Sequence, residues 1–328
     1  MDLWQQELGD DGAPMGEPQP ITVGIGMRHA VFSSDGSKLA YSKGRLVSNL
    51  WRVPILEHRV ATWADAQQLT FDEATLEHVD VTNDGERLLF SSDRRGNMDL
   101  WVMPAAGGDP IQITTDPAPD WAPQLSPDGT KVAFYSYRSG NREAWVMPFS
   151  GGPARQLTDG AATGVSSFTP TWSADGREFL VRRNRGGEAA IWLVPSEGGA
   201  GRPIEGTESG GSGMWMPDGQ VAFTKPTGGL WQVPAEGGIP ELLIESVRGA
   251  VPWSTDGQRL FAWKRGEQSA NIWSQSMRDG SIRRLTDLAG KYGVAFDALA
   301  ADDNYLYFAW QEDVGDIWVM DIVADERE

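Results

Sequence analysis

The feature that most constrains the fold is a motif that recurs along the whole chain at an almost constant spacing. Each copy has a short apolar run, a tight turn, a second apolar run, a polar loop, and an apolar residue followed by Trp. Seven turns are recognisable, and they begin at Ser34, Asn83, Pro127, Ala174, Pro217, Thr255 and Asp302. The turn aspartates run from Asp35 to Asp303 in six steps, so the mean period is about 45 residues.

This period is typical of one four-stranded blade of a β-propeller. In the clearest copy, residues 122–158, we expect strands A to D at 123–125, 131–135, 144–147 and 155–158. Asp128 and Gly129 suit the positive φ of a tight A–B hairpin. The C-strand Trp of each copy is expected to pack between neighbouring blades. The sequence therefore predicts an all-β, seven-bladed propeller of four-stranded antiparallel blades.

We expect a single domain over residues 1–328. Its blades are expected at about 28–71, 77–115, 121–159, 168–206, 211–245, 249–287 and 294–322. The last blade lacks a D strand, and residues 16–22, within an N-terminal strand expected at 16–24, are similar to the D strand at 107–114. The prediction is that this N-terminal strand completes the C-terminal blade and so removes open sheet edges. One C strand is then redundant, either 1–6 or 316–322.

The repeat resembles the TolB-like, PD40 or "WD40-like" propeller family. The resemblance rests on LSPDGTKVAF (125–134), SYRSGNREAWVM (136–147) and GGPARQLT (151–158), with weaker copies over almost the whole chain. It implies protein docking or ligand sensing more than one chemistry, as in the C-terminal sensor-like parts of bacterial regulators and kinases. TolB propellers have six blades, whereas the turns here number seven.

Composition narrows the possible partners and compartments. The net charge is −18, which argues against general nucleic-acid binding because phosphate binding needs a basic face. Cysteine is absent, so disulfides are excluded. No apolar run of 18 residues and no signal-peptide pattern occurs. We expect a monomeric domain without membrane insertion, in the cytoplasm or the periplasm, with any signal or anchor outside this chain.

Motifs for catalysis are missing from the sequence. It has no G-x-S-x-G elbow, no H-E-x-x-H zinc motif and no P-loop. Its histidines are His29, His58 and His78. We therefore assign no catalytic residue, cofactor or metal.

The first candidate surface is the start of each A strand, which in a propeller lines one mouth of the central channel. The copies of the repeat differ from one another at these positions, and function is often carried by such positions. The expected channel-mouth residues are Arg28, His29, Glu77, His78, Trp121, Phe168, Thr169, Phe296 and Asp297. Aromatic walls with a few polar groups suit a small molecule or a peptide. The alternative is that these side chains only line a water-filled channel.

The second candidate surface is formed by the B–C loops, which open on the same face. They hold 12 of the 28 basic residues of this acidic chain. An anionic partner is expected to contact a rim made of Arg95, Arg142, Arg183, Arg185, Lys264 and Arg265, because guanidinium groups bind carboxylates and phosphates in a bidentate way. For Arg94 and Arg138 we favour a local role, in which each Arg fixes its own loop by binding a carbonyl or an Asp.

These observations favour a non-catalytic binding or sensing module, part of a larger regulatory protein, that recognises a protein, a peptide or a small anionic ligand. The alternative is a propeller lyase or hydrolase that uses His29, His78, Glu77 and Asp297 around a metal or as acid and base. An oligopeptidase propeller would need an α/β-hydrolase domain, which this sequence does not contain.

Overall fold

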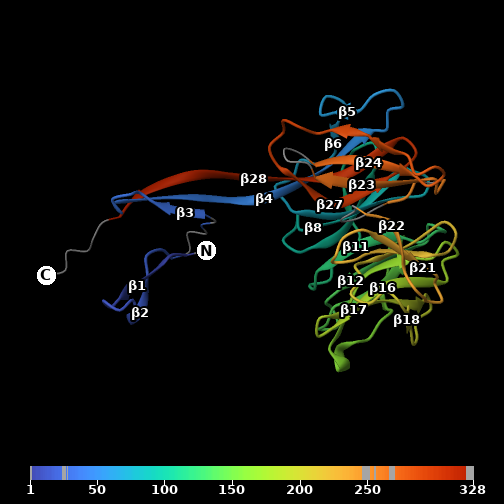
Figure 1. Ribbon diagram of the computed structural model, residues 1–328, viewed down its shortest axis with the longest axis horizontal. Helices are drawn as coiled ribbons and strands as arrows, with labels where there is room; N and C mark the ends of the chain where they lie inside the picture. The colour runs from blue at the N-terminus through green and yellow to red at the C-terminus, as the bar shows by residue number, and fades with distance from the viewer. Residues whose placement is uncertain are drawn as a thin grey trace. The chain divides into compact units, whose positions relative to one another are not determined.

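The computed structural model describes residues 2–23, 27, 29–245, 252–254, 256–265 and 270–322. Apart from one turn of 3-10 helix, η1 (Ala161–Thr163), the secondary structure of these residues is β. The chain divides into two compact units: unit 1 is Met1–Val47 with Glu312–Glu328, and unit 2 is Ser48–Gln311. Two long strands, β4 (Lys38–Pro54) and β28 (Tyr305–Asp321), contribute residues to both units (Figure 1).

Unit 2 contains six blade-type antiparallel sheets in the described part of the chain. Four of them are built from consecutive strands. Their strands are β7 (Leu76–Val81), β8 (Arg87–Ser92), β9 (Asp99–Pro104) and β10 (Ile111–Gln112); β11 (Asp120–Leu125), β12 (Lys131–Ser136), β13 (Glu143–Pro148) and β14 (Arg155–Gln156); β15 (Val165–Trp172), β16 (Glu178–Arg185), β17 (Glu188–Pro195) and β18 (Arg202–Pro203); and β19 (Gly213–Trp215), β20 (Val221–Thr224), β21 (Leu230–Val233) and β22 (Glu241–Ile244). A fifth sheet holds β23 (Arg259–Arg265), β24 (Ala270–Ser276) and β25 (Ile282–Arg284), and a bridge joins Trp253 to Leu260 on its A side.

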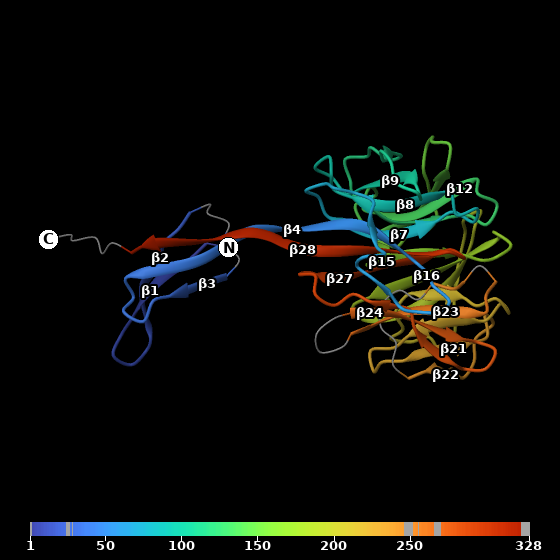
Figure 2. The same ribbon diagram turned by 90° about the horizontal axis from the view of Figure 1, so that it is seen from above.

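The sixth blade, which we call the seam blade, is assembled from both ends of unit 2. β27 (Val294–Ala301) and residues 305–311 of β28 supply its A and B strands. Residues 48–54 of β4, which runs beside β28 (Figure 2), supply its C strand, and strand β6 (Gln67–Gln68) supplies its D strand. The Ile55 N–H donates to the Asn304 carbonyl at 2.8 Å, at the start of the seam. Nearby, β5 (Ala61–Thr62) pairs in parallel with β26 (Thr286–Asp287).

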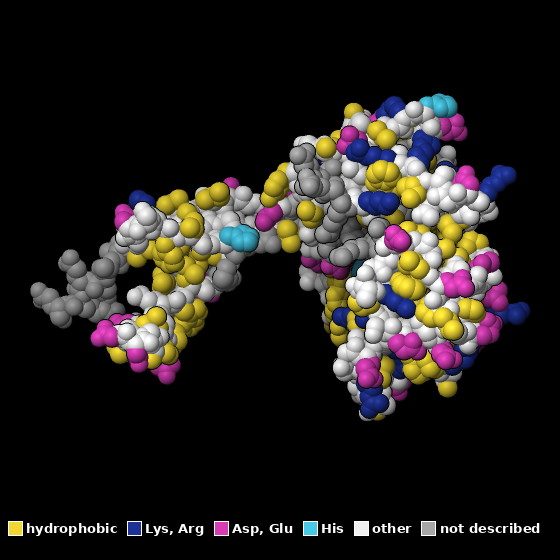
Figure 3. Space-filling view, viewed as in Figure 1, with side chains coloured by type: hydrophobic (Ala, Val, Ile, Leu, Met, Phe, Trp, Pro, Cys, Tyr) yellow, Lys and Arg dark blue, Asp and Glu magenta, His cyan; other side chains and the backbone are white. Residues whose placement is uncertain are grey.

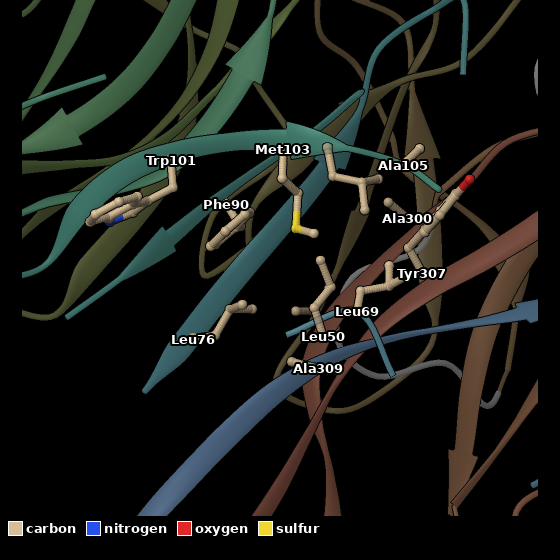
Figure 4. Close-up of a cluster of buried hydrophobic side chains, with 12 residues drawn as sticks. Leu50, Leu69, Leu76, Phe90, Trp101, Met103, Ala105, Ala300, Tyr307 and Ala309 are labelled. Atoms are coloured by element: carbon tan, nitrogen blue, oxygen red, sulfur yellow. The ribbon is translucent and has the colours of Figure 1, made fainter. Parts of the chain in front are cut away.

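The seam is also sealed by a hydrophobic core between the seam blade and the β7–β10 blade. Leu50 and Leu69 come from the start of unit 2, and Tyr307 and Ala309 come from its end. They belong to one buried cluster with Phe90 and Met103 of the β7–β10 blade, and Leu69 lies beside Tyr307 (Figure 4). Burial of apolar surface therefore favours closure of the ring as well as pairing of its strands.

Unit 1 consists of two pieces of blade. β1 (Trp4–Leu8) pairs with β2 (Pro14–Pro20), with Trp4 opposite Pro20. β3 (His29–Phe32) pairs with the first part of β4, and residues 312–321 of β28 lie on the other side of β4. A small core of Met27, Leu39 and Tyr41 holds these strands.

The tight A–B turns have one recurring hydrogen-bond pattern. Asp128 Oδ1 accepts from Ser126 Oγ at 2.6 Å and from the Thr130 N–H at 3.0 Å. Gly129 has φ +70°, which a residue with a Cβ adopts at a cost. The same Asp-centred bonds occur at the turns that contain Asp35, Asp84, Asp175 and Asp256. The repeat in the sequence is therefore a repeat of local turn chemistry.

The all-β propeller class predicted from the sequence is confirmed, but the seven-blade ring is not. The prediction is wrong about the strands that close it: residues 16–24 do not complete the C-terminal blade, because β2 pairs with β1. A short loop separates these two strands, so their pairing has a small entropic cost. Neither candidate C strand is redundant, since residues 4–8 pair with β2 and residues 312–321 lie beside β4. The single domain of residues 1–328 also appears as two units.

Candidate ligand-binding site

A central cavity of about 660 Å³ runs through unit 2 along the A strands of its blades. The starts of four A strands line it, at His78, Ala122, Thr169 and Ser212, and of these His78 and Thr169 were among the expected channel-mouth residues. Each lies six residues before the Asp of its turn. His29, the equivalent position of the first repeat, lies in β3 of unit 1 instead.

The A strands are kinked where they reach the mouth. The pairing register shifts between Glu77 and Val79 in β7 and between Trp121 and Gln124 in β11. His78 has φ +49°, a left-handed conformation that is uncommon for residues other than glycine. Such bulges bend a strand and redirect its side chains. The bulges in β7 and β11 therefore set the direction of the side chains at the channel mouth.

An aromatic cluster stands at the mouth beside the β11–β14 blade. The ring of Trp121 stacks on Tyr135 with centroids 5.4 Å apart, and it meets the edge of Tyr137 at 5.8 Å. His78 meets Tyr135 edge-on at 6.2 Å. Burial raises the pKa of Tyr135 to about 12, so this hydroxyl stays protonated at neutral pH.

Two guanidinium groups share one aromatic ring at the edge of this cluster. Arg142 and Arg182 lie over Phe168 at 4.3 and 4.8 Å from its centroid. Arg142 Nε also donates to Tyr137 Oη at 2.8 Å, and Arg182 Nε donates to the Gly210 carbonyl at 3.0 Å. Burial lowers the pKa of Arg182, and the nearby charge of Arg142 lowers it further. Among the described residues, no carboxylate forms a salt bridge with either Arg.

We call this group the mouth cluster, and its members are Glu77, His78, Trp121, Tyr135, Tyr137, Arg142, Phe168 and Arg182. Four members were expected at the channel mouth and Arg142 was expected in the rim. Tyr135, Tyr137 and Arg182 were not predicted as site residues. Burial raises the pKa of Glu77, and the nearby charge of Asp93 raises it further.

Basic residues, most of them from the B–C loops, pack over the C-strand tryptophans. In each blade of unit 2 a cation lies over the ring of the C-strand Trp, at 4.3 to 5.2 Å from the centroid. The pairs are Arg94–Trp101, Arg138–Trp145, Arg183–Trp192, Lys225–Trp231, Lys264–Trp273 and Lys291–Trp51. Arg183 and Lys264, expected in the rim, therefore cover structural tryptophans.

Two of these loop arginines also form ion pairs, as the local interpretation of Arg94 and Arg138 expected. Arg94 Nη2 lies 2.8 Å from Asp72 Oδ2, and Arg138 Nη2 lies 2.6 Å from Asp120 Oδ2. Arg95 and Arg185 are exposed. Arg28 lies outside the described residues, as do the side chains of Arg265, Phe296 and Asp297.

A belt of hydrogen bonds joins neighbouring A strands deeper in the channel. Asp80 accepts from the Leu125 N–H at 3.1 Å, and Gln124 Oε1 accepts from the Trp172 N–H at 3.0 Å. Thr171 Oγ1 continues the belt by donating to the Gly213 carbonyl at 3.1 Å. Burial raises the pKa of Asp80 to about 6. The sequence held a signal for this belt, since the residue four positions before the turn Asp is polar in three successive copies.

Comparisons with known proteins identify the fold. Residues 98–229 match the Tricorn protease N-terminal beta propeller domain. A protein from Agrobacterium tumefaciens assigned to TolB is similar with a TM-score of 0.65 and 18% identity, over 83% of this chain and 100% of that one. The fold is a β-propeller, similar to that of TolB. TolB from Acinetobacter baumannii is similar with a TM-score of 0.58 and 17% identity, over 76% of this chain and 65% of that one.

The same TolB-like fold also occurs in enzymes. An oligogalacturonate lyase from Vibrio parahaemolyticus is similar with a TM-score of 0.50 and 15% identity, over 79% of this chain and 77% of that one. No curated protein matches the sequence. In the described part of this TolB-like propeller, no three His, Asp or Glu side chains form a group that could hold a metal. None of its described helices is long and apolar enough to span a membrane.

Proposed function

We propose that this TolB-like propeller is a non-catalytic binding module whose mouth cluster holds a carboxylate of a peptide or of a small anionic ligand. The observation that carries the proposal is the pair Arg142 and Arg182. Both lie against Phe168 and have no carboxylate in salt-bridge contact among the described residues. Half-buried charges of one sign are costly unless an opposite charge compensates them. A bound carboxylate supplies that charge.

The geometry also favours a planar anion with apolar surface beside it. Guanidinium groups bind carboxylates through two parallel hydrogen bonds. Tyr137 provides aromatic surface against Arg142, and Trp121 packs against Tyr137. His78, another member of the mouth cluster, lines the channel of about 660 Å³. A few polar groups among aromatic walls are typical of ligand sites in proteins.

Fluorescence anisotropy with labelled hexaglutamate at low salt tests this proposal. The R142A/R182A variant is expected to bind about tenfold more weakly or worse, since hydrogen bonds to charged groups contribute about 1.5–3 kcal/mol each. R185A, which removes an exposed charge from the same strand as Arg182, is expected to bind within about twofold of the unmodified protein. Labelled hexaglutamine is the neutral control.

Equal losses of hexaglutamate affinity in R142A/R182A and R185A would assign binding to diffuse surface charge and reject the mouth cluster as the binding site. Absence of saturable hexaglutamate binding to the unmodified protein would reject a carboxylate-binding mouth.

The enzymatic alternative retains one supporting observation. Glu77, a carboxyl whose pKa is raised by burial, is adjacent to His78 at the channel, and one carboxyl with a raised pKa is suited to acid–base work. The test is incubation with oligogalacturonate and Mn²⁺, followed by ultraviolet absorbance of an unsaturated product. Turnover that is lost in both E77Q and H78A would favour the lyase.

A further inference from the structure

In the described part of unit 1, its blade has an open edge where a D strand would lie. Its A, B and C strands are β3, residues 38–47 of β4, and residues 312–321 of β28. Among the described residues, β4 is the sheet neighbour of this part of β28, because β27 pairs with β28 only as far as Gln311. The unpaired N–H and C=O groups of an edge strand are a template for another strand.

The other blades show what an occupied edge looks like. In the β7–β10 blade, the Leu100 N–H donates to Thr114 Oγ1 at 2.9 Å, and Thr114 Oγ1 donates to Asp99 Oδ1 at 3.3 Å. Gln112 Nε2 donates to the other oxygen of Asp99 at 3.0 Å. The C-strand triplet Asp-Leu-Trp is thus joined to a D strand that reads Gln-Ile-Thr.

This arrangement is repeated in blade after blade. The N–H of the residue before the C-strand Trp donates to a D-strand Thr hydroxyl at 2.8 to 2.9 Å for Leu50, Ala144 and Ile272. In the β15–β18 blade the Ile191 N–H donates instead to Thr207 Oγ1, in the turn after β18, at 3.0 Å. The Thr hydroxyl in turn lies 3.0 Å from Asn49 Oδ1 in the seam blade and 2.6 Å from Glu143 Oε2 in the β11–β14 blade. Even the β1–β2 piece of unit 1 has it, with the Leu3 N–H at 3.0 Å from Thr22 Oγ1.

Asp316, Ile317 and Trp318 form the same triplet without its D strand. The register identifies them, because the Ile322 N–H donates to the Ser37 carbonyl at 2.8 Å as the Phe149 N–H does to Thr130 in the β11–β14 blade. Ile317 is 80% exposed, whereas Leu100 at the equivalent position is 0% exposed. Trp318 is 52% exposed, and apolar side chains gather on this unit (Figure 3).

We propose that this edge of β28 binds an extended segment of another polypeptide that carries Gln-Ile-Thr or Gln-Leu-Thr. The Thr hydroxyl accepts from the Ile317 N–H and donates to Asp316, and the Gln amide donates to the second oxygen of Asp316. Main-chain hydrogen bonds provide affinity in this mode of strand addition, and the side-chain contacts provide specificity. The bound strand also covers Ile317.

The probe is a fluorescein-labelled peptide of sequence GGDPIQITTD, which is residues 107–116 of this chain. Fluorescence anisotropy with the full chain is expected to show saturable binding. Replacing the peptide Thr that corresponds to Thr114 with Val is expected to weaken binding about tenfold, the effect of losing hydrogen bonds to a charged group.

Variants of the full chain locate the binding site. D316A is expected to weaken binding about tenfold. D316N is expected to weaken it less, because Asn49 and Asn271 accept from a D-strand Thr in other blades, and only the bond to the Gln amide is lost. D109A removes an exposed carboxylate from a loop of unit 2 and is the matched control. Circular dichroism confirms that each variant is folded.

Two results would overturn the proposal. One is an affinity for the peptide that is the same in D316A as in the unmodified chain, which would place the peptide elsewhere. The other is self-association of the chain that is lost in D316A and is not competed by the peptide. That result would assign the edge to a second copy of this protein.

Discussion

Nη2 of Arg138 lies 2.6 Å from Oδ2 of Asp120, a carboxylate that solvent does not reach. The Arg138 guanidinium also lies over Phe134 and Trp145 at 5.1 Å from each centroid. One side chain therefore joins the start of an A strand to the B and C strands of the same blade.

Arg138→Ala is expected to destabilise unit 2 by about 3–5 kcal/mol, because it leaves a buried carboxylate without its partner. Urea denaturation measures the loss. The double variant R138A/D120N is expected to recover part of it, since the stranded charge is then gone. R177A removes an exposed arginine and is the control. A loss in R138A no larger than in R177A would mean that Asp120 is accommodated without Arg138.

Stability is expected to vary with pH in two opposite steps. The hydrogen bond from the Ser126 hydroxyl is the largest of the causes that lower the pKa of Asp128 to about 2. The ionised Asp128 therefore stabilises the folded state above pH 3.8, the ordinary pKa of Asp, and this stabilisation is lost as pH falls toward 2. Burial raises the pKa of Asp80 to about 6. The folded state then holds the Asp80 proton more tightly, so this contribution is present below pH 3.8 and is lost as pH rises through 6.

Asp80→Asn is therefore expected to raise the melting temperature at pH 7.5 relative to that of the unmodified protein and to change it little at pH 3.5. An amide fits the belt, because Gln124 accepts the equivalent N–H in the next blade. Melting curves at the two pH values check this. A D80N protein that loses as much stability at pH 7.5 as at pH 3.5 would contradict it.

Arg183→Met is expected to destabilise unit 2 by about 1 kcal/mol, because the charge over Trp192 at 4.8 Å is lost. Hexaglutamate binding is expected to stay within about twofold of that of the unmodified protein, since the half-buried Arg183 covers Trp192 and lies outside the mouth cluster. R185M is the control for stability. A large loss of hexaglutamate affinity in R183M would return Arg183 to the anionic rim predicted from the sequence.

Gly315→Ala is expected to disrupt unit 1 by about 1–3 kcal/mol through overpacking. A Cβ at this position would lie 2.5 Å from the Lys43 carbonyl oxygen and 2.6 Å from the Gly44 Cα, both backbone atoms. Limited proteolysis is expected to cleave residues 38–47 faster in this variant. Gly9→Ala is the control, because the nearest atom to its Cβ would be at the end of the Asp11 side chain, at 3.0 Å. Equal cleavage rates in the two variants would show that β4 and β28 can move apart at Gly315 without loss of stability in unit 1.

Local features of the fold could be predicted from the sequence, because they depend on neighbouring residues. The Asp128–Gly129 turn and the C-strand Trp145 are examples, and each has the structure that its motif indicated. The strands that close the ring could not be predicted in this way. Which B strand a given C strand joins is a long-range choice between segments with the same local pattern.

A signal for that choice was nevertheless present in the sequence. The Asp93 carbonyl accepts from the Gly96 N–H at 2.7 Å, which turns the chain between β8 and β9. The first repeat has Leu46 and Val47 in the corresponding connection, and β4 continues through them as one strand.

In the candidate site, the alternation Tyr135-Ser136-Tyr137 indicated two aromatic side chains on one face of a strand.

The two long strands have a consequence for how such a protein can arise. The chain enters unit 2 after Val47 and leaves it before Glu312, on adjacent paired strands that lie about 4.8 Å apart. Residues 48–311 therefore form a cassette with neighbouring ends, inserted into what would otherwise be a simple hairpin. A gene can gain or lose such a cassette in one recombination event without rethreading the host sheet.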